Sequence, residues 1–408
     1  GVTVVSHHSK DGDEIANATV DSVHRGGPDY FISSELFEHT VETQQHRDGA
    51  KSRNIEQVLQ EALMNPQKEY TERLILMQGM TTFFFVPALP YAMAEVNFKS
   101  ILADSIIDSN SLLIGGKEIQ YNRIHGGSRL VLPDRLLYVF YLLEKSNYSV
   151  SDSLKSFLLT HVDGSKRGEG IHMYGLLQTL YKLHPDVDHL IAALLEKDKN
   201  ALLLVPQGLD DDFLQQVLKR WRESVFAQEL HRIVFLPSMG EREYITLAAI
   251  VDVMLDPFPV GGGRSSLEIF STGTPIVMLE PRTAILQLTR AMYATMGIDP
   301  RGCIASSMED YVSAAVNVAK DIDNIGTSLR EDIMRYNYRL YENRSVISEW
   351  EKMLLYVHST PRPEPNPTLK SVLVDVNDKT DGNDVASANF GNWRFKEPIG
   401  APSYFGDL

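Results

Sequence analysis

The segment 251–279, VDVMLDPFPVGGGRSSLEIFSTGTPIVML, constrains the fold of this chain more than any other. Two short apolar runs, 251–255 and 276–279, flank a Pro- and Gly-rich loop and a short helical stretch that Gly273 ends. Apolar runs of this length bounded by Pro and Gly are typical of parallel strands that are covered on both faces. The segment therefore predicts a strand, a glycine loop, a helix and a second strand of one parallel sheet.

The glycine loop predicts a site for a phosphate group. Gly261, Gly262 and Gly263 carry no side chains, so a ligand can approach the backbone closely. Ser265 and Ser266 follow at the expected start of the helix, where free backbone N–H groups and the helix dipole attract anions. A strand, a glycine loop and hydroxyl groups at a helix start together indicate a bound phosphate.

A purely structural interpretation fits the same residues. Ser265 would be the N-cap and Glu268 the residue at N3 whose side chain returns to the cap N–H, which is a capping box. The loop is not a P-loop, because no Gly-Lys-Ser/Thr follows the glycines, and Ser266 stands where the dinucleotide fingerprint needs its third glycine. Both interpretations stay open, because a well-capped helix start is also a well-ordered anion site.

Composition limits the class of protein and its partners. The 408 residues are 43% hydrophobic and 23% charged, which is an ordinary globular balance. The net charge of −15 argues against nucleic acid or an acidic membrane as a partner, and no apolar run is long enough to predict a spanning helix. The one cysteine, Cys303, excludes an intramolecular disulfide and favours a reducing compartment, so we expect a cytoplasmic or nuclear protein.

The region 166–357 has the pattern of a parallel α/β domain. Apolar runs recur at spacings of about 20 to 30 residues with helical stretches between them, as in successive βα units. These runs are 171–174, 201–205, 232–236, 251–255, 276–279 and 303–305. Ligands of such sheets bind beyond the carboxyl ends of the strands, which is where the glycine loop falls.

The two ends of the chain are less regular. Within residues 1–165, the stretches 2–8, 29–34 and 73–79 read as strands. Residues 358–408 are dominated by Pro, Asn, Asp and Gly, which predicts a disordered or loosely docked tail. We therefore expect three parts, 1–165, 166–357 and 358–408.

Four sequence blocks in order resemble one family of enzymes. The blocks are LLQTLYKLHPDVD, RIVFLPSMGEREYITLAAIVDVMLDPFP, GGGRSSLEIFSTGTPIVML and CIASSMEDYVSAAV. On these blocks, residues 171–357 are similar to the C-terminal lobe of O-GlcNAc transferase and SPINDLY-type enzymes, which form glycosyltransferase family 41. The resemblance implies an α/β fold of the GT-B type with two Rossmann-like lobes, the N-terminal one shortened here.

The resemblance also implies an activity. It implies an inverting glycosyltransferase that moves GlcNAc from UDP-GlcNAc to a Ser or Thr hydroxyl of a protein acceptor, with no metal and no further cofactor. GDP-fucose stays open as a donor. A catalytically inactive nucleotide-sugar-binding relative or scaffold stays open as an alternative, and the blocks fit a UDP-sugar epimerase of the same fold less well.

The same resemblance implies roles for single residues. Lys182, in LYKLHP, would reach the donor diphosphate and offset the charge that develops on the leaving group. Gln178 lies four residues earlier and would face the same cleft. Ser265 and Ser266 would supply the hydroxyls of the glycine loop, and Glu268 the carboxylate that binds the ribose.

Some residues depart from the family pattern. A lysine and a histidine of the family fall on Glu241 and Tyr244, of which Tyr244 keeps an aromatic face for the base while Glu241 cannot replace a cation. Gly263 stands where O-GlcNAc transferase has a histidine. Arg264 follows it, and we expect Arg264 to supply the lost positive charge.

The N-terminal lobe is the least complete part of the resemblance. Only 28 residues precede Asp29, fewer than the βα units of a full lobe need, so we expect a fragment, a shortened gene model or a degenerate relative. The stretch GVTVVSHH fits a first strand, in which His7 or His8 resembles the acceptor-side histidine of the family. His8 is therefore a candidate catalytic residue beside Lys182, although structural histidines are commoner.

Overall fold

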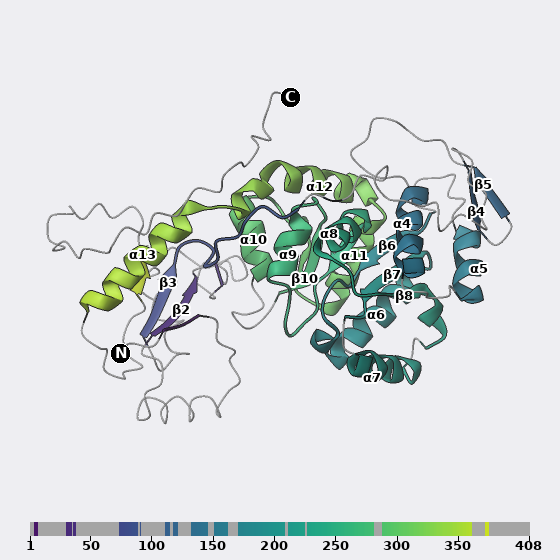
Figure 1. Ribbon diagram of the computed structural model, residues 1–408, viewed down its shortest axis with the longest axis horizontal. Helices are drawn as coiled ribbons and strands as arrows, with labels where there is room; N and C mark the ends of the chain where they lie inside the picture. The colour runs from purple at the N-terminus through teal and green to yellow at the C-terminus, as the bar shows by residue number, and fades with distance from the viewer. Residues whose placement is uncertain are drawn as a thin grey trace, which may run out of the picture.

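The computed structural model describes residues 4–6, 30–34, 36–37, 73–88, 90, 111–114, 117–120, 132–145, 151–161, 170–208, 211–224, 227–280, 288–360 and 372–374. These residues form two separate parallel sheets with helices around them (Figure 1). Strands β4 (Ser111–Ile114) and β5 (Lys117–Gln120) form a two-stranded antiparallel sheet of their own. The predicted α/β class with two Rossmann-like sheets, the GT-B arrangement, is confirmed. No helix within the ranges above is both long and apolar enough to cross a membrane.

The larger sheet contains all six strands that the apolar runs predict, and each strand pairs with its neighbours in parallel. The strands are almost wholly buried, which explains their continuous rather than alternating hydrophobicity. In spatial order they are β11 (Ile304–Ala305), β10 (Ile276–Leu279), β9 (Val253–Leu255), β6 (His172–Gly175), β7 (Ala201–Pro206) and β8 (Ile233–Leu236).

Helices connect these strands, and two of them begin at residues that favour a helix start. Pro185 occupies the first turn of its helix, and the Ser307 hydroxyl caps another by accepting a hydrogen bond from Asp310 N. The helices are α6 (Pro185–Lys197), α7 (Asp211–Arg222), α8 (Glu241–Ile250), α9 (Arg264–Phe270), α10 (Leu288–Met296), α11 (Met308–Ala319) and α12 (Ile325–Tyr336).

The smaller sheet lies beside a helix from much later in the chain. Its order is β1 (Val4–Ser6), β2 (Tyr30–Ser34), β3 (Arg73–Met77) and β12 (Val372–Val374). Helix α13 (Arg344–Ser359) packs Val346 and Met353 against β2 and β3 (Figure 1). The strand β12 falls within 358–408, where we expect a disordered or loosely docked tail, and its backbone pairs in parallel with β3.

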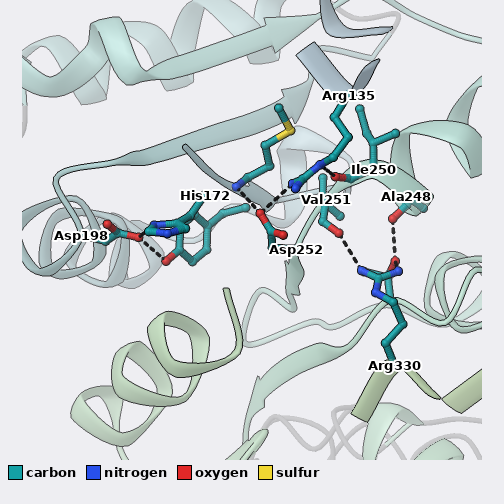
Figure 2. A network of polar contacts seen from close by, with 11 residues as sticks. Arg135, His172, Asp198, Ala248, Ile250, Val251, Asp252 and Arg330 are labelled. Carbon is teal, nitrogen blue, oxygen red and sulfur yellow. Dashed lines mark hydrogen bonds and ion pairs between the residues drawn. The ribbon is translucent and has the colours of Figure 1, made fainter. Parts of the chain in front are cut away.

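Two earlier helices pack against the larger sheet, although they fall in the expected N-terminal part. Residues of α4 (Leu132–Lys145) and α5 (Asp152–His161) join the same hydrophobic core as β6 to β8. Arg135 fixes α4 through a 2.6 Å ion pair with Asp252 and a 2.5 Å hydrogen bond to the carbonyl of Ile250 (Figure 2). The 166–357 region is therefore packed against α4 and α5, which precede it in the chain, and its last helix, α13, packs on the smaller sheet.

A second buried group of polar contacts holds the amino ends of the strands. His172 Nδ1 lies 2.7 Å from Asp198 Oδ2, and the Tyr174 hydroxyl donates to the same oxygen at 2.7 Å (Figure 2). Arg330 of α12 donates to the carbonyl of Val251 at 2.9 Å. Because these contacts lie at the amino ends of β6 and β9, they leave the carboxyl ends of the strands free for a site.

Candidate functional site

A cavity of about 490 Å³ lies at the carboxyl ends of the strands, where the sequence predicts a ligand. It is bounded by the loops after β6 and β7 and by the first turns of α8 and α9. Its lining residues are Leu177, Gln178, Thr179, Tyr181, Lys182, Pro206, Gly208, Tyr244, Gly263, Arg264, Ser265 and Glu268. The chain thus brings together seven of the residues that were predicted to bind a donor. A larger cavity, of about 980 Å³ between α6 and α11, contains none of them.

Lys182 and Gln178 form the polar centre of this cavity. The chain leaves β6 and makes a 3-10 turn over Leu180–Lys182, which turns the half-buried lysine back toward Gln178. Lys182 Nζ donates to Gln178 Oε1 at 3.0 Å and to the carbonyl oxygen of Gly261 at 2.9 Å. Gln178 Nε2 donates to Ser265 Oγ at 2.5 Å. A cation, an amide and a hydroxyl therefore converge from two segments of the chain, the loop after β6 and the start of α9.

The glycine loop needs glycine at two positions for steric reasons. A Cβ on Gly262 would lie 2.2 Å from Ser266 Oγ and 2.7 Å from Gln178 Nε2. A Cβ on Gly261 would lie 2.8 Å from Asp256 Oδ2. Gly261 and Gly262 therefore leave room for neighbouring side chains of the same chain, and the close approach of a ligand stays a prediction.

The capping-box interpretation of α9 is wrong. The helix begins two residues earlier than expected, with Gly263 as the N-cap and no side-chain cap hydrogen bond. Ser265 instead lies inside the first turn and accepts from Gln178, whereas the carboxylate of Glu268 accepts from Arg264. The two residues of the expected box are therefore both engaged by side chains of the cavity.

The two loop serines have different surroundings. Ser265 lines the cavity, but Ser266 is fully buried with Oγ 3.3 Å from Thr289 Oγ1. Gly262 is also absent from the lining and is buried against Ser266. A ligand in the cavity would meet Ser265 directly and Ser266 only through the loop.

Arg264 lies between two carboxylates at the edge of the cavity. Its Nε donates to Glu268 Oε1 at 2.7 Å, and an Nη lies 3.4 Å from Glu241 Oε1. The Arg264 side chain is 68% exposed, while that of Glu268 is only 10% exposed. Burial raises the pKa of Glu268, and the hydrogen bond and charge of Arg264 act to lower it.

Tyr244 lines the cavity from the first turn of α8. Its hydroxyl donates a 2.7 Å hydrogen bond to the carbonyl of Leu177, so the ring has a fixed orientation. Burial raises the pKa of the Tyr244 hydroxyl, and the charge of Glu268 adds to the effect. A held aromatic ring at this place is compatible with base stacking, which is still a prediction.

Several functional candidates are absent from the sequence-based set. Asp256 is buried under the glycine loop and accepts from Gly262 N at 2.7 Å and from Thr289 Oγ1 at 2.7 Å. The sequence could have indicated Asp256, because it directly follows the strand 251–255, at the carboxyl end where ligands of such sheets bind. Thr289 gave no signal, because it lies 33 residues further along the chain. Tyr181, whose side chain forms part of the lining, was passed over beside Lys182.

His7 and His8 lie outside the described residues, so their proposed catalytic role stays a prediction. Within the part of the chain that the structure describes, no group of three or more His, Cys, Asp or Glu residues could hold a metal ion. Cys303 is buried and free, as expected of a small core residue.

Comparison with known proteins decides the family of the region that contains this cavity. The model of the family "Glycosyl transferase family 41" matches residues 149–349, just under half of the chain. This region belongs to glycosyl transferase family 41. The match includes every residue that lines the cavity.

The family 41 region is similar to two curated proteins at low identity. A UDP-N-acetylglucosamine–peptide N-acetylglucosaminyltransferase of Caenorhabditis elegans is 24% identical over 124 residues, 30% of this chain and 11% of that protein. A probable transferase of the same kind, SPINDLY, of Eustoma exaltatum subsp. russellianum is 24% identical over 172 residues, 40% of this chain and 18% of that protein. The matches thus span less than a fifth of either relative.

Solved structures overlap the chain partially. An O-GlcNAc transferase mutant of Thermobaculum terrenum has 23% identity and a TM-score of 0.40 over 45% of this chain and 35% of its own. The sucrose-phosphate synthase of Thermosynechococcus elongatus has 10% identity and a TM-score of 0.39 over 87% of this chain and 68% of its own. The fold assignment rests on the two parallel sheets rather than on these overlaps.

Proposed function

We propose that this chain is an inverting glycosyltransferase that uses a nucleotide diphosphate sugar as donor and a protein Ser or Thr hydroxyl as acceptor. Family 41 membership of residues 149–349 supports the transferase class. The two curated relatives are named as UDP-N-acetylglucosamine–peptide transferases, which makes UDP-GlcNAc the donor to test first.

The observation that carries the proposal is the position of Lys182. Its ammonium group is held by a backbone carbonyl and an amide side chain, at 2.9 Å and 3.0 Å, on the wall of a cavity that it shares with Ser265. A diphosphate in this cavity would meet a held cation and the Ser265 hydroxyl. Ionic hydrogen bonds of this kind are among the strongest that a protein can offer a phosphate.

The same contacts would serve the transfer step. The acceptor oxygen attacks the anomeric carbon from the face opposite the diphosphate, the bond from that carbon to the diphosphate oxygen breaks, and negative charge grows on the diphosphate. A cation that is already in place stabilises this charge without reorganisation, so Lys182 would act in catalysis as well as in binding. The hydroxyl proton leaves to a general base.

The rest of the cavity suits a nucleoside. Arg264 donates to Oε1 of Glu268. The second carboxylate oxygen, Oε2, can accept hydrogen bonds from ribose hydroxyls. The ring of Tyr244 is on the same wall. Because Gln178 connects Lys182 to Ser265, we assign the diphosphate to these two residues and the nucleoside to Tyr244 of α8 and Glu268 of α9.

A second function is favoured by one observation. Glu241 stands where the family has a lysine, and it contacts Arg264 at 3.4 Å, so a family cation is replaced by an anion that also neutralises its neighbour. This exchange favours weak or altered donor use, as in a nucleotide-sugar-binding scaffold without catalysis.

Calorimetry and a transfer assay with the same purified protein separate the two functions. The proposed enzyme binds UDP-GlcNAc and either transfers GlcNAc to Ser/Thr-containing peptides or slowly hydrolyses the donor, with UDP released in both cases. Binding of UDP-GlcNAc with no release of UDP would establish the scaffold instead. Absence of binding to both UDP-GlcNAc and GDP-fucose would overturn both functions.

A further inference from the structure

One peptide group of the glycine loop is held at both of its ends by opposite charges. The carbonyl oxygen of Gly261 accepts from Lys182 Nζ at 2.9 Å, and the N–H of Gly262 donates to Asp256 Oδ1 at 2.7 Å. These two atoms belong to the same peptide bond. The peptide therefore connects a buried carboxylate on one side to the cavity cation on the other.

The carboxylate is built into this place with little freedom. Asp256 is 3% exposed, and Thr289 Oγ1 donates to its second oxygen at 2.7 Å. Gly261 approaches it so closely that a Cβ would lie 2.8 Å from Oδ2. Each oxygen of the carboxylate thus has a donor, and the loop has no room to move toward it.

Keeping this carboxylate ionised is costly for the fold. Burial raises the pKa of Asp256 to about 6, although the hydrogen bonds from Thr289 and Gly262 and the charge of Lys182 all act to lower it. An asparagine or a serine could accept from the loop without that cost. A buried charge that lowers stability and contacts a ligand loop indicates a functional requirement.

We propose that Asp256 is a positioning residue which, through the Gly261–Gly262 peptide, holds Lys182 at the place of the donor diphosphate. The inference rests on the proposed function, because it gives Asp256 a part in the same donor site. Asp256 does not touch the donor. It acts by orienting the peptide whose carbonyl group holds the ammonium.

The physical reason is cooperative polarisation. A carboxylate that accepts from the N–H increases the negative charge on the carbonyl oxygen of the same peptide, which strengthens the hydrogen bond from Lys182. Without the carboxylate, a peptide between two glycines can rotate at little steric cost, because neither residue has a Cβ. The ammonium would then lose a fixed partner and spread over several positions.

Asp256 also has an opposite effect on an anionic ligand, which makes the proposal testable. A negative charge this close to the cavity repels a diphosphate, so simple electrostatics predicts tighter donor binding after its removal. Positioning predicts weaker binding. The other charged or titratable groups that face Asp256 are Lys182, Tyr244, Tyr293 and Tyr311. Burial raises the pKa of each of the three tyrosines, so none of these tyrosines changes charge between pH 5 and 7.5.

The first test needs no ligand. In protein labelled with ¹⁵N-glycine, the Gly262 amide should titrate with a midpoint near pH 6, because its acceptor is Asp256. The titration should be absent in Asp256→Asn and should move to higher pH in Thr289→Val, which loses a hydrogen bond to the charged form. A Gly262 amide that does not titrate, or that still titrates in Asp256→Asn, would overturn the link.

The second test is donor affinity by calorimetry against pH. UDP-GlcNAc is the probe, because both ends of its diphosphate are esterified and it has no ionisation near pH 6, unlike the terminal phosphate of UDP. We expect wild-type affinity to fall below pH 6, and Asp256→Asn to bind about tenfold more weakly at pH 7.5 with no such fall, a loss equal to one charge-assisted hydrogen bond. Asp310→Asn, which removes one exposed negative charge on α11, is the control.

The outcomes separate this inference from the proposed function. Equal or tighter binding of UDP-GlcNAc by Asp256→Asn would mean that repulsion dominates, and would overturn the positioning role while leaving the donor site intact. If the wild-type protein binds no UDP-GlcNAc at any pH, the proposed function fails. The positioning role for the donor then fails with it, whatever the Gly262 titration shows about the loop.

Discussion

Arg264 Nε donates a 2.7 Å hydrogen bond to Glu268 Oε1, one turn further along α9. The same guanidinium lies 3.4 Å from Glu241, so one exposed cation is placed between two carboxylates at the edge of the cavity. Without it, Lys182 would be the one cation among the residues that line the cavity. The affinity for a diphosphate should therefore depend on Arg264 as well as on Lys182.

We expect Arg264→Gln to weaken UDP-GlcNAc binding about three- to tenfold, because two carboxylates lose their counter-charge near the diphosphate. The effect is modest since the Arg264 side chain is 68% exposed and screened by water. Calorimetry at low and high salt measures it, and the loss should shrink as salt rises. Glu241→Gln in the same background should restore part of the affinity, and tighter binding by Arg264→Gln would show that Arg264 blocks Glu268.

Lys182→Ala should lower UDP-GlcNAc affinity by about a hundredfold and the transfer rate by more, because an ionic hydrogen bond is lost in the bound state and again as the leaving group gains charge. Lys199→Ala is the matched control, since Lys199 is exposed in the turn between α6 and β7. Calorimetry and release of UDP measure the two effects. Unchanged affinity in Lys182→Ala would place the diphosphate elsewhere.

Gly262→Ala should abolish donor binding while the fold is kept. The added Cβ would lie 2.2 Å from Ser266 Oγ, so the loop or the serine must move and the contacts around Gln178 change with it. Gly240→Ala is the steric control, because its Cβ would meet Glu243 Oε2 at an ordinary 3.7 Å. Circular dichroism and calorimetry on both variants make the comparison. Normal donor affinity in Gly262→Ala would show that the donor does not need the loop in this conformation.

Arg135→Met should destabilise the protein by about 3–5 kcal/mol, because it leaves the carboxylate of Asp252 buried without its counter-ion. The two side chains are 7% and 2% exposed, and the ion pair between them is 2.6 Å long. Urea unfolding measures the change, with the exposed Lys197→Met expected to stay within about 0.5 kcal/mol. A loss below about 1 kcal/mol would mean that α4 contributes little to the stability of the larger sheet.

The free energy of unfolding should depend on pH through two carboxylates, Asp198 and Asp256, whose pKa values are shifted in opposite directions. Burial acts to raise the pKa of Asp198, but the hydrogen bond and charge of His172 outweigh it and bring that pKa down to about 2. This stabilisation is complete above about pH 4 and is lost as the pH falls through about 2. The raised pKa of Asp256, about 6, gives stability that is present below about pH 4 and lost as the pH rises through about 6.

Unfolding followed by denaturant from pH 7 to 2 measures both effects. Stability should rise by roughly 2–3 kcal/mol from pH 7 to 4 and then fall by about 2 kcal/mol toward pH 2. Asp256→Asn should remove the rise and Asp198→Asn should remove the fall. A rise that persists in Asp256→Asn would assign it to another group.

Local patterns in the sequence were enough to find the larger sheet. The apolar runs from 171–174 to 303–305 are all strands, because parallel strands that are buried on both faces must be continuously hydrophobic. The start of α6 at Pro185 and the cap at Ser307 were predictable for a similar reason, since both depend on residues adjacent to the helix. The family blocks contained seven of the twelve residues that line the cavity as predicted donor-binding residues.

Contacts between distant segments decided what each of those residues does. Ser265 was expected to cap α9, but its hydroxyl accepts from Gln178, 87 residues earlier in the chain. Lys182 donates to the Gly261 carbonyl, 79 residues later in the chain. Thr289 donates a hydrogen bond to Asp256, 33 residues earlier. Sequence periodicity reports which face of an element is buried, but not which side chain from another element meets it there.

The sequence by itself thus determined the parallel α/β architecture and the edge of the sheet that holds the site, because both follow from short-range hydrophobic and turn patterns. Only the tertiary structure showed that Asp256 and Lys182 hold the two ends of one peptide, that Arg264 of α9 also contacts Glu241 of α8, and that α13 packs on the smaller sheet. These relationships depend on how separate elements pack, and no local pattern encodes them.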